Sequence, residues 1–261
     1  MKKNIKRRTR LALLLAGLLL AAVSTNAQQQ PEAEAQVDLV SQYLWRGLVK
    51  GGVSVQPQLK LSWQGAYVSV LGSKGFDNAD AEELDLSLGY KFPFGLNVGV
   101  NDYWQSGVAE NDLYFEYGKD NTAHRLEGNI GYSCKYGSLQ AYCIFYGWDT
   151  TVEGKQAYST YIELTVPFRL SGLDWTVKAG MTPMESAGSP HIVVPKSGVL
   201  YKIVGDYTYA DGPACVLASL RATKTLSLGH GLSLPVYAEF SANPYLQTAH
   251  IMGGLAIKMA K

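Results

Sequence analysis

The sequence predicts an all-β protein, a closed antiparallel up-and-down β-barrel that spans a membrane. Three observations favour this fold. Hydrophobic residues make up 47% of the 261 residues, yet past position 36 they alternate with polar residues instead of forming long runs. Many alternating stretches are about 10 to 12 residues long, the length that a tilted strand needs to cross a bilayer. The connections alternate between tight turns and longer polar loops.

The N-terminal residues are typical of a secretory signal peptide. Six basic residues lie within the first ten positions, and the apolar residues 11–23 precede small residues that end at Ala27. This pattern predicts cleavage after Ala27, because so short an apolar run cannot span about 30 Å of hydrocarbon as a helix. We expect a signal peptide at 1–27, a short periplasmic segment at 28–35 and a barrel at 36–261. Without the six basic residues, 17 basic face 22 acidic residues, so the net charge changes from +1 to −5.

The strands are predicted from their period of two. In residues 82–92, for example, apolar side chains alternate with polar or small ones. Successive side chains of a strand point to opposite faces, so each such strand has one apolar and one polar face. The pattern predicts strands at 36–47, 53–63, 66–73, 82–92, 96–105, 123–135, 138–148, 157–168, 173–182, 213–227, 232–242 and 247–259.

Turn length supports a count of twelve strands. Membrane barrels have short periplasmic turns and longer outer loops in alternation. The alternative is fourteen strands, with 112–118 and 199–210 as two further spans. That count would place the tight turn at 136–137 among the outer loops, whereas twelve strands leave 106–122 and 183–212 as outer loops. An even count brings both termini to the periplasmic side.

Aromatic residues gather near the predicted strand ends. Amphipathic rings at both membrane interfaces form an aromatic girdle in such barrels. We expect the tryptophans to form this girdle, namely Trp45, Trp63, Trp104, Trp148 and Trp175.

Strand parity also predicts which side chains line the lumen. A basic residue on the lipid face near the midplane costs about 2–4 kcal/mol, so charged strand residues are expected inside. The candidate lumen residues are Asp38, Gln42, Arg46, Lys60, Glu83, Asp85, Lys91, Arg125, Glu127, Glu163, Lys178, Arg221 and Glu239. With Lys135, Asp174 and Lys258, the set holds eight basic and seven acidic residues. This balance favours charge pairs across a narrow lumen over a ring of one sign, and leaves an open and a closed lumen equally plausible.

Nothing in the sequence predicts catalysis. The four histidines stand apart from any nucleophile motif, and metal-ligand spacings such as Cys-x-x-Cys are absent. We therefore expect no enzyme, no metal and no cofactor. The odd cysteine count (Cys134, Cys143 and Cys215) does not indicate a disulfide framework. The low charge content, 17%, and the lack of a basic patch exclude a nucleic-acid partner.

The segment from 37 to 73 resembles the opening of the TorF-like family of outer-membrane porins. The matching residues are Asp38, Ser41, Tyr43, Arg46, Gly47, Gln56, Pro57, Gly65 and Tyr67, and the later Asn243-Pro244-Tyr245 fits the same pattern. The resemblance implies a membrane barrel with pore activity and no established substrate.

The sequence leads to one functional hypothesis and one alternative. The hypothesis is passive diffusion of small polar solutes through the outer membrane of a Gram-negative cell. The alternative is a closed structural or partner-binding barrel that acts through loops 106–122 and 183–212. Expected partners are outer-membrane lipids, the barrel assembly machinery and small polar solutes; the oligomeric state is not predicted.

Overall fold

The structure is a computed structural model of the whole chain. It describes residues 30–77, 81–108, 113–118, 121–151, 153–193 and 202–260. The predicted signal peptide at 1–27 lies outside the described residues.

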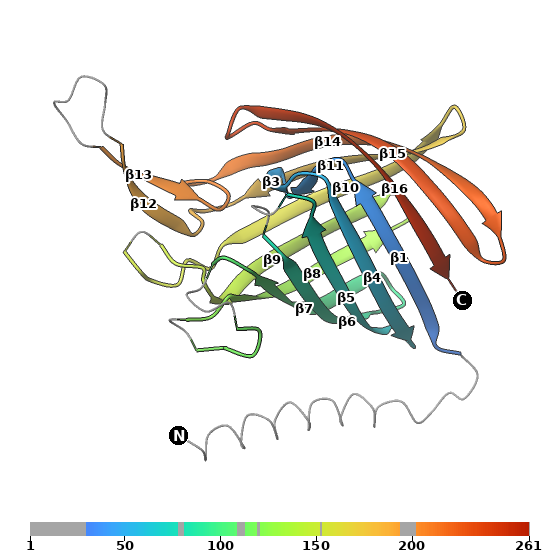
Figure 1. Cartoon of the computed structure of the whole chain (residues 1–261), viewed down its shortest axis with the longest axis horizontal. Coiled ribbons are helices and arrows are strands. Elements are labelled where there is room, and N and C mark those ends of the chain that lie inside the picture. The colour runs from blue at the N-terminus through green and yellow to red at the C-terminus, as the bar shows by residue number, and fades with distance from the viewer. Residues whose placement is uncertain are drawn as a thin grey trace, which may run out of the picture.

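The described residues form a closed antiparallel barrel of twelve strands, in the order β1-β16-β15-β14-β11-β10-β9-β8-β7-β6-β5-β4 (Figure 1). The wall strands are β1 (Glu32–Val40), β4 (Ser54–Trp63), β5 (Ala66–Gly75), β6 (Glu83–Lys91), β7 (Leu96–Gln105), β8 (His124–Cys134), β9 (Gly137–Gly147), β10 (Thr160–Leu170), β11 (Leu173–Thr182), β14 (Ala214–Gly229), β15 (Leu232–Asn243) and β16 (Thr248–Ala260). The prediction of an all-β barrel with twelve strands is confirmed. None of the described residues forms a helix long and apolar enough to cross a membrane.

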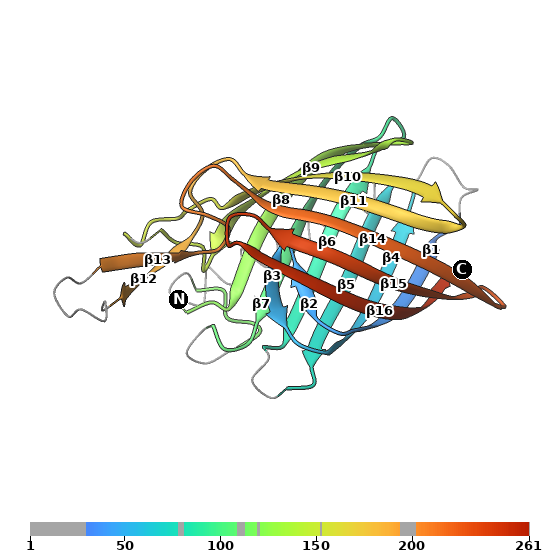
Figure 2. The same ribbon diagram turned by 90° about the horizontal axis from the view of Figure 1, so that it is seen from above.

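The alternative of fourteen strands is wrong. Strands β12 (Gly188–Val193) and β13 (Lys202–Tyr207) form a separate two-stranded sheet. This hairpin projects beyond the end of the barrel in both views (Figures 1 and 2). The described part of the alternating segment 199–210, from 202 to 207, therefore belongs to a hairpin outside the wall.

The wall has an apolar outer face. Val37, Leu59 and Leu61 alternate with lumen residues along β1 and β4, and they are 45%, 49% and 46% exposed. A soluble barrel would bury such side chains, whereas lipid would cover them in a membrane.

The two ends of the barrel differ. At one end, here called the turn end, the wall strands are joined by short turns such as 64–65, 171–172 and 230–231. The other end, the loop end, carries the longer connections. Both the start of β1 and the end of β16 lie at the turn end, because β1 and β16 pair along their length with Glu34 opposite Ala260.

The first predicted strand, 36–47, is wrong in its second half. Strand β1 ends at Val40, and the next residues form a small hairpin of β2 (Tyr43–Trp45) and β3 (Leu48–Gly51) that is separate from the wall sheet. Strands β1 and β4 pair directly with each other, from Glu32 opposite Ser62 to Val40 opposite Ser54. Residues 41–53, here called the inner hairpin, are therefore an insertion that the closed wall does not need.

Several lumen side chains lie flat on the wall over glycines. A Cβ at Gly89 would lie 2.5 Å from the Tyr67 ring, and one at Gly254 would lie 2.5 Å from the Tyr237 ring. Both tyrosines are the direct cross-strand partners of these glycines. Because glycine leaves this space empty, each ring covers its neighbour strand instead of projecting into the lumen.

Residues 113–118, here called the outer flap, pack against the outer face of β7 and β8. Asp102 and His124 lie on the same outward face as Trp104, and the Asp102 Oδ1 and His124 Nδ1 atoms are 2.7 Å apart. The Tyr117 hydroxyl donates to Asp102 Oδ2 at 2.6 Å, and its ring stacks on His124. The outer flap thus covers the Asp102 carboxylate and the His124 imidazole on the outer face of the wall.

Candidate functional site

The inner hairpin turns at Arg46 and Gly47, which both have positive φ angles, 52° and 81°. Positive φ at both central positions matches the twist of a two-residue hairpin turn. A glycine is required at position 47, because a Cβ there would clash with the backbone oxygen of Val216 on β14. The turn places the Arg46 side chain at the tip of the hairpin.

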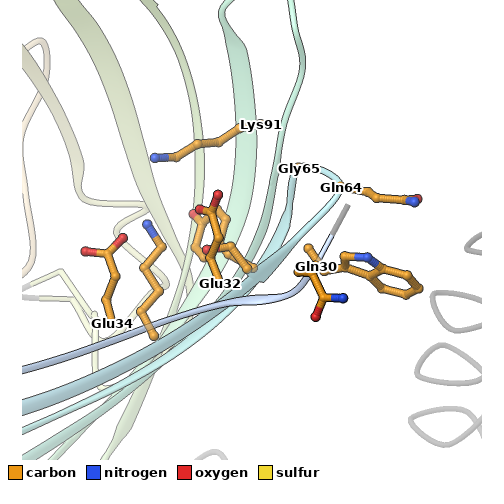
Figure 3. A pocket seen from close by; sticks show the side chains of 10 residues that line it. Gln30, Glu32, Glu34, Gln64, Gly65 and Lys91 are labelled. Atoms are coloured by element: carbon orange, nitrogen blue, oxygen red, sulfur yellow. The ribbon is translucent and has the colours of Figure 1, made fainter. Parts of the chain in front are cut away.

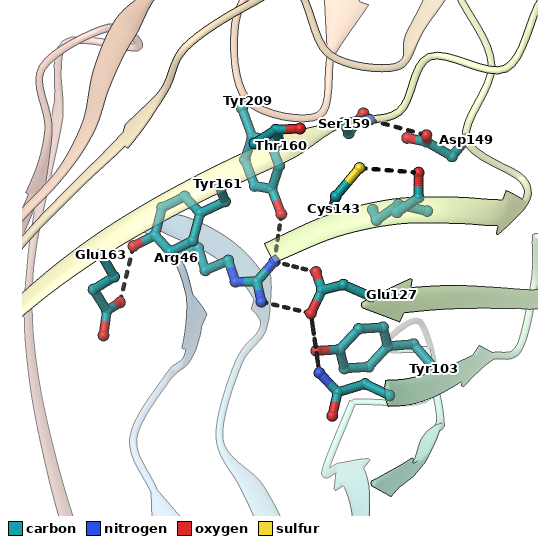
Figure 4. Close-up of polar contacts among 12 residues, drawn as sticks. Arg46, Tyr103, Glu127, Cys143, Asp149, Ser159, Thr160, Tyr161, Glu163 and Tyr209 are labelled. Atoms are coloured by element: carbon teal, nitrogen blue, oxygen red, sulfur yellow. Dashed lines mark hydrogen bonds and ion pairs between the residues drawn. The ribbon is translucent and has the colours of Figure 1, made fainter. Parts of the chain in front are cut away.

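Arg46 forms a bidentate ion pair with Glu127 on β8 (Figure 4). Its Nη1 donates to Glu127 Oε2 at 2.6 Å and its Nη2 donates to Glu127 Oε1 at 2.9 Å. Glu127 Oε1 also accepts from the Tyr103 hydroxyl at 2.8 Å and from Asn101 Nδ2 at 3.0 Å. The carboxylate therefore has all the hydrogen bonds that a buried charge needs to be tolerated.

Aromatic rings enclose the Arg46 guanidinium. Its central carbon lies 4.5 Å from the ring centre of Trp45, 4.1 Å from that of Tyr142 and 4.8 Å from that of Tyr161. The same guanidinium donates to the Tyr209 hydroxyl at 2.7 Å. Cation–π contacts strengthen when they are shielded from water, as these are.

The inner hairpin crosses the lumen from one wall to the other. On one side, Lys50 Nζ donates to Gln105 Oε1 of β7 at 2.6 Å. On the other side, Asn243 of β15 donates through Nδ2 to the Gly47 oxygen at 3.3 Å. The strands that Arg46 contacts, β8 and β10, lie between β7 and β15 in the order of the wall.

The inner hairpin and the side chains around Arg46 form a layer that is shielded from solvent. The side chains of Glu127 and Arg46 are 0% and 8% exposed, and Tyr161 and Tyr209 are 0% exposed. Burial raises the pKa of Tyr209, which lies in the loop before β14, to about 12. The loop end of the lumen is therefore closed in this structure by the inner hairpin together with Tyr209.

Below this layer, the lumen contains a polar cavity of about 540 Å³. Trp45 and Arg46 form its closed end, while Lys91, Asn97 and Ser133 lie toward the turn end. The rest of the lining is mostly amide and hydroxyl side chains, such as Asn129 and Gln140. The cavity offers hydrogen bonds to a polar solute along its length.

The structure brings several predicted lumen residues together as ion pairs. Besides Arg46 with Glu127, Lys178 Nζ lies 3.2 Å from Glu163 Oε1, and Arg221 Nη2 lies 2.6 Å from Glu239 Oε2. These pairs join neighbouring strands along the wall. Lys258, at the turn end, pairs in the same way with Glu34, at 2.7 Å.

The other predicted lumen residues lie in different surroundings. Glu83, Asp85 and Arg125 sit near the inner hairpin, and the Arg125 guanidinium lies 3.8 Å from the Trp148 ring centre. Asp38 accepts from Gln36 at 2.6 Å. The remaining three are Gln42, which lies in the inner hairpin between β1 and β2, and Lys60 and Lys91, which lie toward the turn end.

The predicted aromatic girdle needs correction at two positions. Trp45 stacks on Tyr209 and meets Tyr103 edge-on, so it lies inside the barrel, and Trp148 packs on the lumen residue Arg125. A ring at a strand end can cover a guanidinium as well as face lipid, and strand position does not distinguish the two. The other girdle candidates, Trp63, Trp104 and Trp175, share the outward face of their strands.

The sequence reasoning missed the aromatic residues that close the lumen. Tyr209 lies in a loop that was expected to be outside the barrel, and Tyr142 and Tyr161 are lumen positions on β9 and β10. The Arg46-Gly47 dipeptide could have indicated the inner hairpin, because it can form a tight hairpin turn. Among the described residues, no three His, Cys, Asp or Glu side chains are placed to hold a metal ion, and the three cysteines are free.

Residues 25–190, more than half of the chain, match the family model described as "Bacterial protein of unknown function (Gcw_chp)". The chain belongs to this family. The more specific resemblance to the TorF-like porins is not tested by this match and stays a prediction. No curated protein matches the sequence.

Solved structures that match the fold include three channel proteins. They are the KdgM porin (7% identity, 87% of this chain and 98% of that chain, TM-score 0.42), an outer membrane channel from Pseudomonas putida F1 (12%, 91% and 98%, 0.45) and the CymD monoaromatic hydrocarbon channel (10%, 90% and 89%, 0.42).

Proposed function

We propose that this protein is an outer-membrane channel for small polar solutes and that the inner hairpin is its gate. The observation that carries the proposal is a polar cavity of about 540 Å³ inside a barrel whose outer wall is apolar. An apolar exterior suits lipid, and a hydrogen-bonding interior suits passage of solutes that lipid excludes.

The position of the inner hairpin supports a gating role. It is inserted between β1 and β4, yet these two strands pair directly, so the wall closes without it. Backbone hydrogen bonds tie its first and last residues to the barrel, from Ser41 N to the Gly253 oxygen and from Phe76 N to the Val53 oxygen, and side-chain contacts hold the part between them. That part can leave the lumen without breaking the hydrogen-bond ladder between β1 and β4, as an opening element must.

A single substitution at the hairpin tip tests the gate. Gly47→Ala introduces a Cβ that meets the Val216 backbone, and it also strains the positive φ angle. Gly107→Ala is the matched control, since Gly107 has a similar φ of 79° but has open space around its Cβ position. In planar bilayers, the Gly47 variant should conduct more often than the wild type, while the Gly107 variant should behave like the wild type.

A second candidate function is favoured by the sealed layer. A lumen closed by fully buried Glu127 and Tyr161 also suits a barrel that never opens and acts through its loops. The same experiment separates the two proposals. If the Gly47 variant folds, as judged by its heat-modifiable migration in gels, but shows no unitary conductance, the channel proposal fails and the loop-binding proposal gains.

A further inference from the structure

Two lysines in the lumen at the turn end take no part in the ion pairs. Arg46, Lys178, Arg221 and Lys258 each pair with a carboxylate. Among the residues that the structure describes, Lys60 on β4 and Lys91 on β6 form no ion pair. Two positive charges at this end of the lumen are therefore left without an ion pair.

Both lysines lie close to one aromatic ring. Tyr67 lies on β5, between the strands that carry them, and its ring centre is 5.3 Å from Lys60 Nζ and 5.9 Å from Lys91 Nζ. Both distances allow a cation–π attraction. The ring can receive both because it lies flat over Gly89 and so turns one face to the lumen.

This group stands where a solute would enter the cavity. A pocket of about 250 Å³ at the turn end is lined by Lys60, Tyr67 and Lys91. Tyr67 and Lys91 also line the larger cavity that reaches up to the inner hairpin. A solute moving between the turn end and the cavity passes these two side chains.

The carboxylates of the pocket compensate the two lysines only in part. Figure 3 shows Glu32 and Glu34 in the same pocket as Lys91. Glu34 pairs with Lys258 at 2.7 Å and attracts Lys60 and Lys91 only from a longer distance, and Glu32 is exposed to solvent at the start of β1. Two ammonium groups that share one ring repel each other, and an anion between them would relieve this repulsion.

We propose that Lys60 and Lys91, positioned by Tyr67, form a binding site for the carboxylate or phosphate group of a small solute at the turn end of the lumen. This inference rests on the proposed channel function and adds a solute class to it. Tyr67 is a positioning residue, because it acts on the anion through the two lysines.

The test measures anion binding to the folded full-length barrel in detergent. Its lysines are converted to ¹³C-dimethyl-lysine, which keeps the positive charge, and NMR signals are assigned with Lys60→Arg and Lys91→Arg. The probes are acetate and inorganic phosphate, titrated separately, with uncharged acetamide as the control. We expect both signals to shift saturably with at least one anion and not with acetamide, and the responding probe identifies the preferred group.

Variants decide whether the site is specific. Binding by the double variant Lys60→Gln, Lys91→Gln, followed by calorimetry, should weaken at least tenfold. Lys224→Gln removes one charge at the turn end outside the pocket and should change the affinity less than twofold. Tyr67→Leu should weaken binding, and Tyr67→Phe, which retains the ring, should restore it.

The outcomes separate this inference from the channel proposal. Absence of a saturable shift with either anion, or equal affinity in the double variant and the wild type, overturns the inference even if the barrel conducts. Saturable binding by a folded barrel that never conducts supports the site and refutes the channel.

Discussion

Removal of the Glu127 charge should release the inner hairpin. Glu127→Gln keeps the volume of the side chain but leaves the Arg46 guanidinium buried without a counter-charge. The side chains of Glu127 and Arg46 are 0% and 8% exposed, so water screens the pair very little. Breaking such a buried pair by removing one partner typically costs about 3–5 kcal/mol.

This cost falls on the closed state alone, because Arg46 regains water when the hairpin leaves the lumen. Each factor of ten in an equilibrium corresponds to about 1.4 kcal/mol. The ratio of closed to open molecules should therefore fall by about two to three and a half orders of magnitude.

A partly buried residue of the hairpin reports the open fraction. Leu48 packs against the cluster of Tyr161 and Tyr209, so Leu48→Cys should react with a maleimide much faster when the hairpin is displaced. The background protein carries serine in place of its three native cysteines. Glu127→Gln should raise the labelling rate at least a hundredfold, or until opening is no longer limiting, and should raise the open probability in bilayers.

The matched control is Glu239→Gln. Its partner Arg221 is 39% exposed, so water replaces much of the lost interaction, and about 1 kcal/mol or less is expected. That change is below about tenfold and lies away from the hairpin. Equal labelling rates in the two variants would refute the role of the Arg46–Glu127 pair in holding the hairpin closed.

Three further predictions concern other parts of the barrel. Burial raises the pKa of Tyr209 to about 12, above the value near 10 of an exposed tyrosine. The neutral Tyr209 therefore stabilises the closed state fully below about pH 10, and this stabilisation is lost as the pH rises through about 12. The open probability should increase in that range. Gly89→Ala should push the Tyr67 ring into the lumen and lower the unitary conductance, with about 1–3 kcal/mol of destabilisation from overpacking. Tyr117→Phe removes the hydrogen bond to Asp102, worth about 1 kcal/mol, and should speed proteolysis in the outer flap roughly fivefold.

Each of these predictions has its own control. Gly128→Ala adds a Cβ that makes only ordinary contacts, at 3.8 Å from Phe145, and should leave conductance unchanged. Tyr136→Phe removes a hydroxyl from an exposed residue at the turn end and should not alter cleavage of the outer flap. Tyr209→Phe should abolish the rise in open probability between pH 10 and 12; persistence of that rise would assign it to another group.

The wall was predictable because a membrane barrel repeats one local rule. Every strand must turn an apolar face to lipid, so the period of two marks strands such as 53–63 and 82–92, found as β4 and β6 with ends shifted by at most one residue. Turn length then determined the strand count. The rule does not identify an insertion that folds inward, because Tyr43 and Trp45 continue the alternation of β1 although the chain has left the wall.

Partnerships inside the lumen were not predictable for a related reason. Arg46 and Glu127 are 81 residues apart, and they meet only because the inner hairpin crosses the barrel to β8. Local patterns report which face a side chain occupies, and the partner depends on strand tilt and register. The same limit applies to Trp45, whose amphipathic ring suits a membrane interface and a guanidinium equally well.

The positions of the charged lumen residues carry information that their numbers do not. Eight basic and seven acidic predicted lumen residues suggested near neutrality. Near the inner hairpin, Glu83 and Asp85 face the basic residues Lys50 and Arg125, whereas Lys60 and Lys91 at the turn end are left without an ion pair among the described residues. A lumen with nearly balanced charge can therefore still present positive charge at one end, and this charge would draw an anionic group to the turn end. Selectivity in this barrel would then depend on where each charge stands, and it would change when the inner hairpin moves Lys50 and Arg46 away from the acidic residues they face.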